Sequence, residues 1–300
     1  MSRGALTALA AYVMWGLSPI FWRLGEAAAD SLLTFRVVAT LVVVGLIQIG
    51  RDRGRNVRTA VADRRVVGAM AVSAALVSSN WLIYIWSVTN ERVLEASLGY
   101  FLNPLISVVL GVTVLRERLR PVQWIAIAVV AGGVIVLSVD LGRVPWIAIA
   151  LAVTFGLYGL IRKTAPVGSL DGLTIEVSLL LPFALVALGA LTAAGEGAAE
   201  VSAPWGWVWV MGAGLMTAVP LVLFASAARR IELWMIGVLQ YVVPTLQFLL
   251  GVLAYDEPWA GGQVVGYVVI WFGLAVFAGE GIVNAQRVRS RGDRVLGLGR

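Results

Sequence analysis

A long apolar stretch with a proline near its middle constrains the fold of this chain more than any other feature. Residues 94–115 are long enough to cross a bilayer, because an α-helix rises about 1.5 Å per residue and the hydrocarbon core is about 30 Å thick. Pro104 removes a backbone donor and frees the carbonyl of Tyr100. Lipid offers no hydrogen bonds, so protein or a polar cavity must receive that carbonyl. We therefore expect this segment to face the interior of a helix bundle.

The same layout recurs 140 residues later in the chain. Residues 234–254 have Pro244 near their centre, which frees the carbonyl of Gln240, so we expect a helix break at both Pro104 and Pro244. The same shift superimposes other uncommon residues: Gly16 on Gly156, Thr34 on Thr174, Gly111 on Gly251 and Glu117 on Glu257. The sequence therefore predicts two copies of one unit, over 1–140 and 141–284, followed by a basic cytoplasmic tail at 285–300.

Composition assigns the chain to a membrane. Hydrophobic residues make up 60% of it and charged residues 13%, whereas a soluble domain is about half apolar and about a quarter charged. Ten apolar runs separate at charged or Gly/Pro-rich breaks, near 4–22, 31–50, 66–88, 94–115, 122–139, 146–161, 173–191, 205–227, 233–254 and 263–283. We predict an all-α integral membrane protein with ten transmembrane helices, five in each copy.

The positions of Lys and Arg predict the orientation. With the N-terminus in the cytoplasm, the inner segments hold most of the 23 Lys and Arg residues, and the outer loops hold only Arg23, Arg92 and Arg143. This bias predicts a multi-pass protein of the inner (plasma) membrane with both termini cytoplasmic. Because five spans is an odd number, the second copy enters from the opposite side, as in the inverted repeats of many secondary transporters. A duplication that only stabilised a bundle is the alternative.

The residue types that the chain lacks exclude several kinds of catalytic and metal site. The chain has no Cys and no His, which excludes disulfides, thiolate and imidazole catalysis, and most zinc or haem sites. No Walker-type GxxxxGK[ST] motif occurs, so ATP-driven pumping is not expected. We predict no cofactor and no metal. The net charge of +6 follows from the positive-inside bias, and no nucleic-acid partner is expected.

Several stretches are similar to one transporter family: AYVMWGLSPIFWRL, LLTFRVVAT, SSNWLIYIWSVTNERVLEASLGYFLNPL, FGLYGLIRK and LQYVVPTLQFLL. They resemble the RarD-type proteins of the EamA branch of the drug/metabolite transporter superfamily, over nearly the whole chain up to about Asn284. The resemblance implies a ten-span inner-membrane permease with two EamA repeats, associated with chloramphenicol sensitivity. The family's usual His beside the second-span Arg is replaced by Phe35. If that His handles protons, this chain does without it.

Polar and aromatic side chains within the spans are candidates for lining a cavity. Asn80 is explained equally well by a hydrogen bond between helices, whereas Asn103, at the proline, is favoured as functional. Gln240 and Gln247 lie seven residues apart, about two turns, and share one helix face. Five aromatic residues are candidates for the wall of an amphipathic-solute site, although helix packing also explains each of them: Trp15, Trp81, Tyr100, Tyr158 and Tyr241.

Three charged residues stand within the spans, where charge is costly. Arg36 and Glu95 lie at the same outer depth, so we expect them to pair, as an outer gate in preference to a fixed clamp. Glu176 corresponds to Arg36 after the 140-residue shift, but inversion moves it toward the inner side. There it is nearest to a group of basic residues: Arg162, Lys163, Arg229 and Arg230. Both carboxylates are candidates for proton coupling.

These features favour a secondary transporter that works by alternating access, and the resemblance favours export of a small amphipathic metabolite or drug. We expect no enzyme, although an intramembrane enzyme that uses Glu95 and Glu176 and a non-transporting partner protein remain alternatives. The expected partners are the lipid bilayer and a small-molecule solute, with coupling to protons left open. The pattern Gly262-x-x-x-Gly266 allows close helix contact within one chain or in a homodimer.

Overall fold

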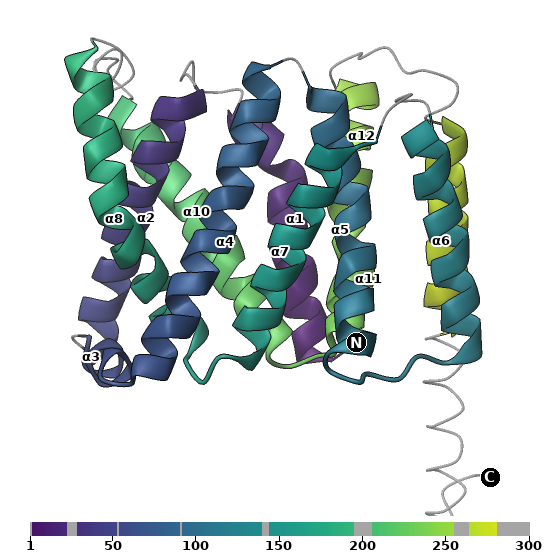
Figure 1. The fold of residues 1–300 in the computed structure, drawn as a ribbon, viewed down its shortest axis with the longest axis horizontal. Coiled ribbons are helices and arrows are strands. Elements are labelled where there is room, and N and C mark those ends of the chain that lie inside the picture. The colour runs from purple at the N-terminus through teal and green to yellow at the C-terminus, as the bar shows by residue number, and fades with distance from the viewer. Residues whose placement is uncertain are drawn as a thin grey trace, which may run out of the picture. The chain divides into compact units, whose positions relative to one another are not determined.

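The computed structural model describes residues 2–22, 29–52, 54–90, 92–139, 144–194, 206–254 and 264–280. Within these ranges the chain forms α-helices joined by short turns, and they contain no β-strand (Figure 1). Several residues discussed above lie outside the described ranges: Arg23, Arg143, Glu257, Gly262 and the basic tail at 285–300.

The helices follow the predicted apolar runs. Their bounds are α1 (Arg3–Trp22), α2 (Ala29–Asp52), α3 (Arg55–Val61), α4 (Arg64–Thr89), α5 (Val93–Thr113), α6 (Pro121–Val139), α7 (Trp146–Thr164), α8 (Ser169–Ala193), α10 (Gly206–Ala228), α11 (Leu233–Gln240) and α12 (Val242–Ala254). Among the described residues, nine segments are long and apolar enough to span a membrane, with α11 and α12 counted as one segment, and a shorter apolar helix covers Val264–Glu280. The tenth predicted run extends beyond the described residues at both ends. The chain is thus an all-helical, multi-span membrane protein.

The short helix α3 is not among the predicted runs. It follows Gly54, whose φ of 74° lies in the left-handed region that glycine adopts without strain. The carbonyl of Gly54 accepts a hydrogen bond from the amide of Arg58 at 3.0 Å, which closes the first turn of α3. The basic segment between the second and third spans is therefore partly helical.

The chain divides into two compact units, which are described separately. The first comprises Met1–Leu115 and Trp146–Asp256, and the second comprises Arg116–Pro145 and Glu257–Arg300. Each unit therefore takes segments from both of the copies expected from the sequence.

Small residues allow the helices of the first unit to approach closely. A Cβ atom added to Gly156 of α7 would lie 2.6 Å from Cγ2 of Ile106 in α5. A Cβ atom on Gly214 of α10 would lie 2.7 Å from the carbonyl carbon of Ala39 in α2. Such contacts leave room only for glycine, and they are the usual way in which membrane helices gain van der Waals packing.

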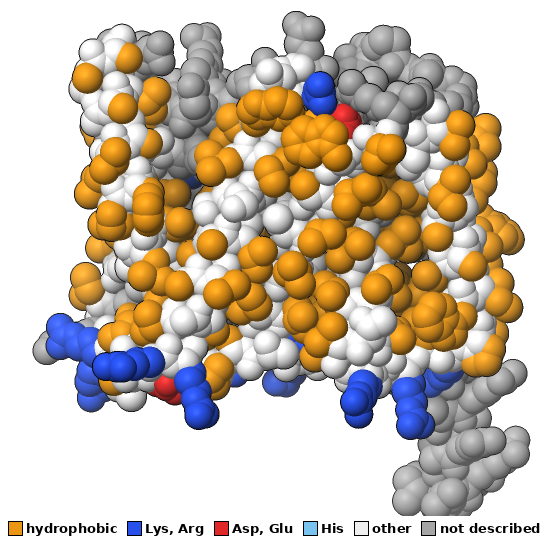
Figure 2. Space-filling model, in the orientation of Figure 1, with side chains coloured by type: hydrophobic (Ala, Val, Ile, Leu, Met, Phe, Trp, Pro, Cys, Tyr) orange, Lys and Arg blue, Asp and Glu red, His pale blue; other side chains and the backbone are white. Residues whose placement is uncertain are grey.

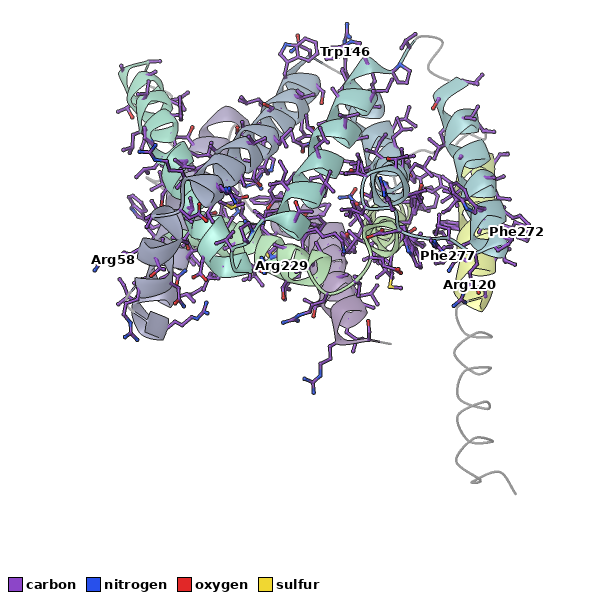
Figure 3. All side chains as sticks on the ribbon, turned by 60° about the horizontal axis from the view of Figure 1, so that its bottom comes forward. Arg58, Arg120, Trp146, Arg229, Phe272 and Phe277 are labelled. Carbon is purple, nitrogen blue, oxygen red and sulfur yellow. The ribbon has the colours of Figure 1, made fainter. Side chains whose placement is uncertain are left out.

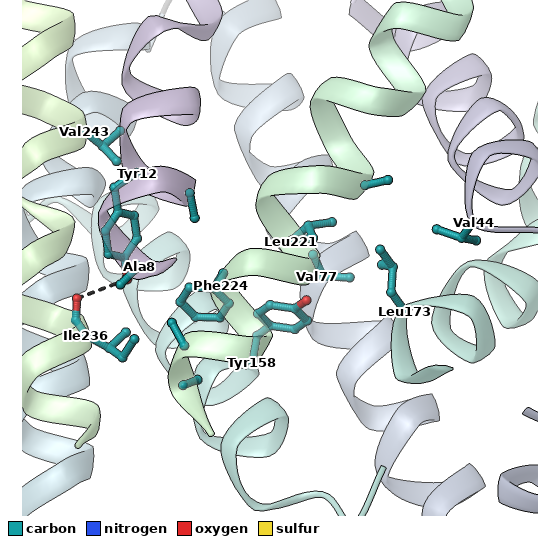
Figure 4. Packing of buried hydrophobic residues seen from close by; sticks show 14 of the residues in the cluster. Ala8, Tyr12, Val44, Val77, Tyr158, Leu173, Leu221, Phe224, Ile236 and Val243 are labelled. Atoms are coloured by element: carbon teal, nitrogen blue, oxygen red, sulfur yellow. Dashed lines mark hydrogen bonds between the residues drawn. The ribbon is translucent and has the colours of Figure 1, made fainter. Parts of the chain in front are cut away.

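The core of the first unit is a cluster of aliphatic and aromatic side chains from several helices (Figure 4). Tyr158 of α7 stacks on Phe224 of α10, with ring centroids 5.9 Å apart and an interplanar angle of 13°. The hydroxyl of Tyr12 in α1 donates to the carbonyl of Ile236 in α11 at 3.1 Å, shown as the dashed line in Figure 4. The bond from Tyr12 to Ile236 links helices from the two sequence copies, and the stacking of Tyr158 on Phe224 links two helices of the second copy.

Basic residues of the first unit gather at one end of its spans, along the lower edge of Figure 2. We call this the basic end; the helix ends and turns there carry Arg3, Arg51, Arg55, Arg58, Arg64, Arg65, Arg162, Lys163, Arg229 and Arg230. The ammonium of Lys163 fixes the ends of two helices here, because it donates to the carbonyls of Ala228 at 3.1 Å and Ile231 at 2.5 Å. Figure 3 labels Arg229 at this end and Trp146, the first residue of α7, at the other end.

The second unit contains α6 and the helix Val264–Glu280. A Cβ atom on Gly266 would lie 2.5 Å from the side chain of Leu137, so this glycine serves a close contact within the chain. At one end of the pair, Glu280 accepts hydrogen bonds from Arg120 at 2.6 Å and from Gln123 at 3.1 Å.

Candidate functional site

The spans that contain Pro104 and Pro244 meet inside the first unit. Helix α11 packs on α5, and a Cβ atom on Gly237 would lie 2.5 Å from the carbonyl oxygen of Pro104. The hydroxyl of Tyr241 donates to the carbonyl of Phe101 at 3.0 Å. Positions 101 and 241 are equivalent under the 140-residue shift, so the spans cross where their corresponding residues meet.

The two prolines affect their spans differently. The ninth span is divided at Tyr241 into α11 and α12, three residues before Pro244. Helix α5, in contrast, runs unbroken through Pro104, where a break was expected. A single missing backbone bond can be accommodated in a membrane helix when a neighbour packs on it, and Gly237 of α11 packs there.

Buried amides flank the crossing. Asn103 of α5 and Gln240 of α11 are 5% and 4% exposed. Their amide oxygens receive no hydrogen bond from the described residues, so each is an unfilled acceptor within the bundle. Gln247 lies on α12 and is partly exposed. The shared face expected for Gln240 and Gln247 assumed one continuous helix, and the break at Tyr241 removes that assumption.

Asn80 joins two helices of the bundle. Its amide nitrogen donates to the carbonyl of Leu151 and to the hydroxyl of Thr154, both at 2.9 Å, and thereby links α4 to α7. This geometry favours the structural interpretation of Asn80. Trp15 and Tyr158 likewise pack in the aromatic core, each against Phe155, at centroid distances of 5.8 and 5.6 Å.

Arg36 of α2 lies among aromatic side chains. Its guanidinium carbon is 5.0 Å from the ring centroid of Trp22 in α1 and 5.1 Å from that of Trp81 in α4. Its Nε donates to the hydroxyl of Thr217 in α10 at 3.1 Å. Tyr100 of α5 is close enough to interact with this charge. The contacts of Arg36 thus replace the expected pairing with Glu95.

Glu95 is directed elsewhere, which explains why the two charges do not pair. Its side chain is fully buried, and one carboxylate oxygen accepts a hydrogen bond from the amide of Ile147 at 2.9 Å. The first amides of a helix have no partner within it, and a negative charge is favourable at a helix N-terminus. Glu95 of α5 therefore caps the start of α7.

A buried ionic cluster lies at the basic end. Arg162 of α7 and Glu176 of α8 are 3.2 Å apart, with side chains that are 2% and 1% exposed. Ser73 of α4 donates to the same carboxylate, and Arg162 donates to the carbonyl of Ser169 at 2.6 Å. Glu176 therefore meets one of the basic residues near which the sequence located it, and the cluster joins α4, α7 and α8.

A second polar contact at the basic end was not predicted from the sequence. Gln48 of α2 donates to Asp171 at 2.7 Å and to Thr174 at 3.3 Å, both in α8. An amide in the last two turns of one span and a carboxylate in the first turn of another were the available signal. Arg229 adds hydrogen bonds to the carbonyls of Ala165, at 2.9 Å, and Val167. Together these bonds close this end of the unit.

The described residues offer charged and polar groups that could bind a solute. Within the described ranges, no group of three or more His, Cys, Asp or Glu residues could hold a metal ion. Glu95 lies at the first turn of α7 and Glu176 at its last turn, because they contact Ile147 and Arg162. Fifteen helical residues separate these contacts, a rise of about 22 Å.

Comparisons of the sequence with known proteins agree on one family. The EamA-like transporter family matches residues 2–139 of this chain. An uncharacterized transporter of Pseudomonas aeruginosa is 40% identical over 297 residues, covering 97% of this chain and 98% of that protein. The protein RarD of Streptomyces exfoliatus is 40% identical over 289 residues, covering 96% and 92%. One solved structure, described only as the crystal structure of a protein, shares the fold with a TM-score of 0.69 and 20% identity, over 92% of this chain and 97% of the other.

Proposed function

Because the chain belongs to the EamA-like transporter family, among its RarD-type proteins, we propose that it moves small amphipathic solutes by alternating access between two inverted repeats. The family assignment supports a membrane transporter. The substrate class, the mechanism and the direction are parts of the proposal, and the resemblance favours export. The basic end is the cytoplasmic side in this proposal, by the positive-inside rule.

The main support for this proposal is a pair of contacts between the two copies that the 140-residue shift converts into each other. Gly16 of α1 faces Leu246 of α12, where an added Cβ would lie 2.8 Å from the leucine Cβ. Gly156 of α7 faces Ile106 of α5 in the same way. The 140-residue shift converts the first pair into the second, with the copies exchanged. Contacts that exchange in this manner are expected between two copies related by a two-fold axis.

The second unit also contains two contacts that the 140-residue shift converts into each other. A Cβ on Gly133 of α6 would lie 2.9 Å from the carbonyl oxygen of Gly266. A Cβ on Gly273 would lie 2.9 Å from the carbonyl oxygen of Ala126. The 140-residue shift again converts one contact into the other. Contacts in two separate sets of helices are thus related by the same 140-residue shift, which supports a duplicated architecture.

The directions of corresponding helices support inversion. Helix α1 begins at the basic end with Arg3, whereas its counterpart α7 ends there with Arg162 and Lys163. In Figure 3 the start of α7, at Trp146, lies opposite Arg229. Antiparallel copies are the basis of alternating access in many transporters, because either half can rock about a site between them.

In such a cycle, the bonds at the basic end would keep this side of the protein closed. Arg162 with Glu176, and Gln48 with Asp171, join helices that must separate before a solute passes to this side. Farther from this end, Arg36 is partly exposed. We infer that the structure represents a state closed toward the cytoplasm. The long separation of Glu95 from Glu176 weighs against an intramembrane enzyme that uses both carboxylates.

A transport assay tests the proposal. Purified protein in liposomes would be supplied with labelled amphipathic solutes, beginning with chloramphenicol, and flux would be compared with protein-free liposomes with and without a pH gradient. We expect saturable flux that accelerates when unlabelled solute is present on the far side. No protein-dependent flux of any solute, or flux without such exchange, would contradict alternating access.

The absence of cysteine from the sequence provides a second measurement. Ala165→Cys introduces one thiol at a position that is 6% exposed at the basic end. A membrane-impermeant maleimide added on the cytoplasmic side should label it slowly at rest and faster in the presence of a transported solute. Arg58→Cys, on the exposed side of α3, is the matched control and should label rapidly in both conditions. Labelling of Ala165→Cys that a transported solute leaves unchanged would argue against opening at this end.

A further inference from the structure

Arg36 is a membrane-embedded cation whose contacts within the described residues are all uncharged. It bonds to the hydroxyl of Thr217 and lies over the rings of Trp22 and Trp81. Arg162, the other arginine buried in a span, is paired with Glu176 at 3.2 Å. Among the described residues no carboxylate pairs with Arg36. The fold therefore neutralises one intramembrane arginine and leaves the charge of the other available.

The geometry of Arg36 suits an anion. A guanidinium has five N–H donors in a planar fork that matches a carboxylate in a bidentate arrangement. Only Nε of Arg36 is engaged by a side chain of the described residues, Thr217. That bond fixes the plane of the guanidinium, so the two terminal nitrogens are held in position for a ligand. Charge within a span is costly, which favours a role for it in binding a substrate.

The surroundings of Arg36 suit an aromatic or apolar body. Trp22 and Trp81 contribute ring faces, and Tyr84 packs edge to face on Tyr100 with centroids 6.0 Å apart. Arg36, Trp22, Trp81 and Tyr100 are all partly exposed. These side chains come from four helices, α1, α2, α4 and α5. A solute bound among them contacts both the charge and the rings.

We propose that Arg36 binds the carboxylate of an organic anion whose aromatic body packs against Trp22, Trp81 and Tyr100. The inference rests on the proposed transport function, and it names the substrate class. It also assigns Arg36 a role different from an outer gate, because a gate requires an acidic partner and Glu95 caps α7 instead.

Binding can be measured without transport. The probes are 3-phenylpropionate, 3-phenylpropionamide and 3-phenylpropylamine, which share one skeleton and differ in charge. Calorimetry would use the purified full chain in nanodiscs of zwitterionic lipid. We expect the acid to bind at least tenfold more tightly than the amide, and the amine to bind more weakly than either. Equal affinity for acid and amide would overturn the proposal.

Variants assign the effect to Arg36. Arg36→Gln should weaken binding of the acid at least tenfold and leave the amide unchanged, whereas Arg36→Lys should retain part of the preference for the acid. Trp81→Leu should weaken acid and amide alike, and Arg58→Gln, on the exposed side of α3, should change neither. If Arg36→Gln does not fold, a reduced preference for the acid in Arg36→Lys or Thr217→Val supplies the same test. An unchanged preference in every folded variant, or displacement of the acid by added anionic lipid, would refute a solute site.

The transport assay separates this inference from the proposed function. Saturable transport of neutral solutes that Arg36→Gln leaves unchanged, with no preference for the acid, would retain the transporter and reject the anion site. Binding of the acid that depends on Arg36, without transport of any solute by the unaltered protein, would reject the transporter and retain the site.

Discussion

Glu176→Gln should destabilise the protein more than a typical polar substitution. The change keeps the shape of the side chain and its hydrogen-bonding oxygen but removes the negative charge. Arg162 then stays buried, 3.2 Å from a neutral group, with the carbonyl of Ser169 as a remaining acceptor. The cost arises mainly from the uncompensated guanidinium.

The magnitude follows from the burial of the pair. Removing one partner of a buried ion pair costs about 3–5 kcal/mol, and the amide keeps part of the hydrogen bonding, so we expect about 3 kcal/mol. For a chain of this size, that corresponds to a fall in Tm of about 6–12 °C. The double variant Arg162→Met with Glu176→Met removes both charges. Its Tm should return to within a few degrees of the unaltered protein or exceed it, since apolar replacements of such pairs are often neutral or stabilising.

The assay is thermal unfolding in one detergent, followed by tryptophan fluorescence, for the unaltered protein, Glu176→Gln, the single variants Arg162→Met and Glu176→Met, and the double variant. A cycle of this kind measures the coupling between the two residues. The double variant should also label faster at Ala165→Cys, because the cytoplasmic side loses a closing contact. A Glu176→Gln protein with an unchanged Tm, or a double variant as unstable as the sum of the single variants, would refute the argument.

Two further predictions concern the contacts between the copies. Tyr241→Phe removes the donor to the carbonyl of Phe101 and should cost about 1 kcal/mol, measured as a lower Tm; an unchanged Tm would indicate that this bond does not contribute to stability. Gly156→Val introduces a Cβ 2.6 Å from Ile106 and should lower both Tm and the yield of folded protein, because overpacking typically costs about 1–3 kcal/mol. Gly45→Ala is the control, since nothing lies within 4 Å of its added Cβ, and a Gly156→Val protein as stable as this control would contradict the close contact.

The fold class could be predicted from the sequence because it depends on local quantities. The lengths of the apolar runs and the sides of the arginines require no knowledge of which helix packs on which. The effect of the prolines was only half predictable. Both remove a backbone donor, yet α5 continues through Pro104 while the ninth span divides before Pro244. The difference depends on neighbouring helices.

The candidate site, too, could be predicted from the sequence only in part. The position of a residue along a span follows from the sequence at about 1.5 Å per residue, which correctly brought Glu176 to the level of Arg162. The direction of a side chain changes by about 100° per residue, so its partner is set by the rotation of each helix in the bundle. That rotation directs Arg36 to Thr217 and Glu95 to Ile147. The sequence by itself therefore determined the depth of each charge in the membrane, and only the tertiary structure decided which partner each one meets.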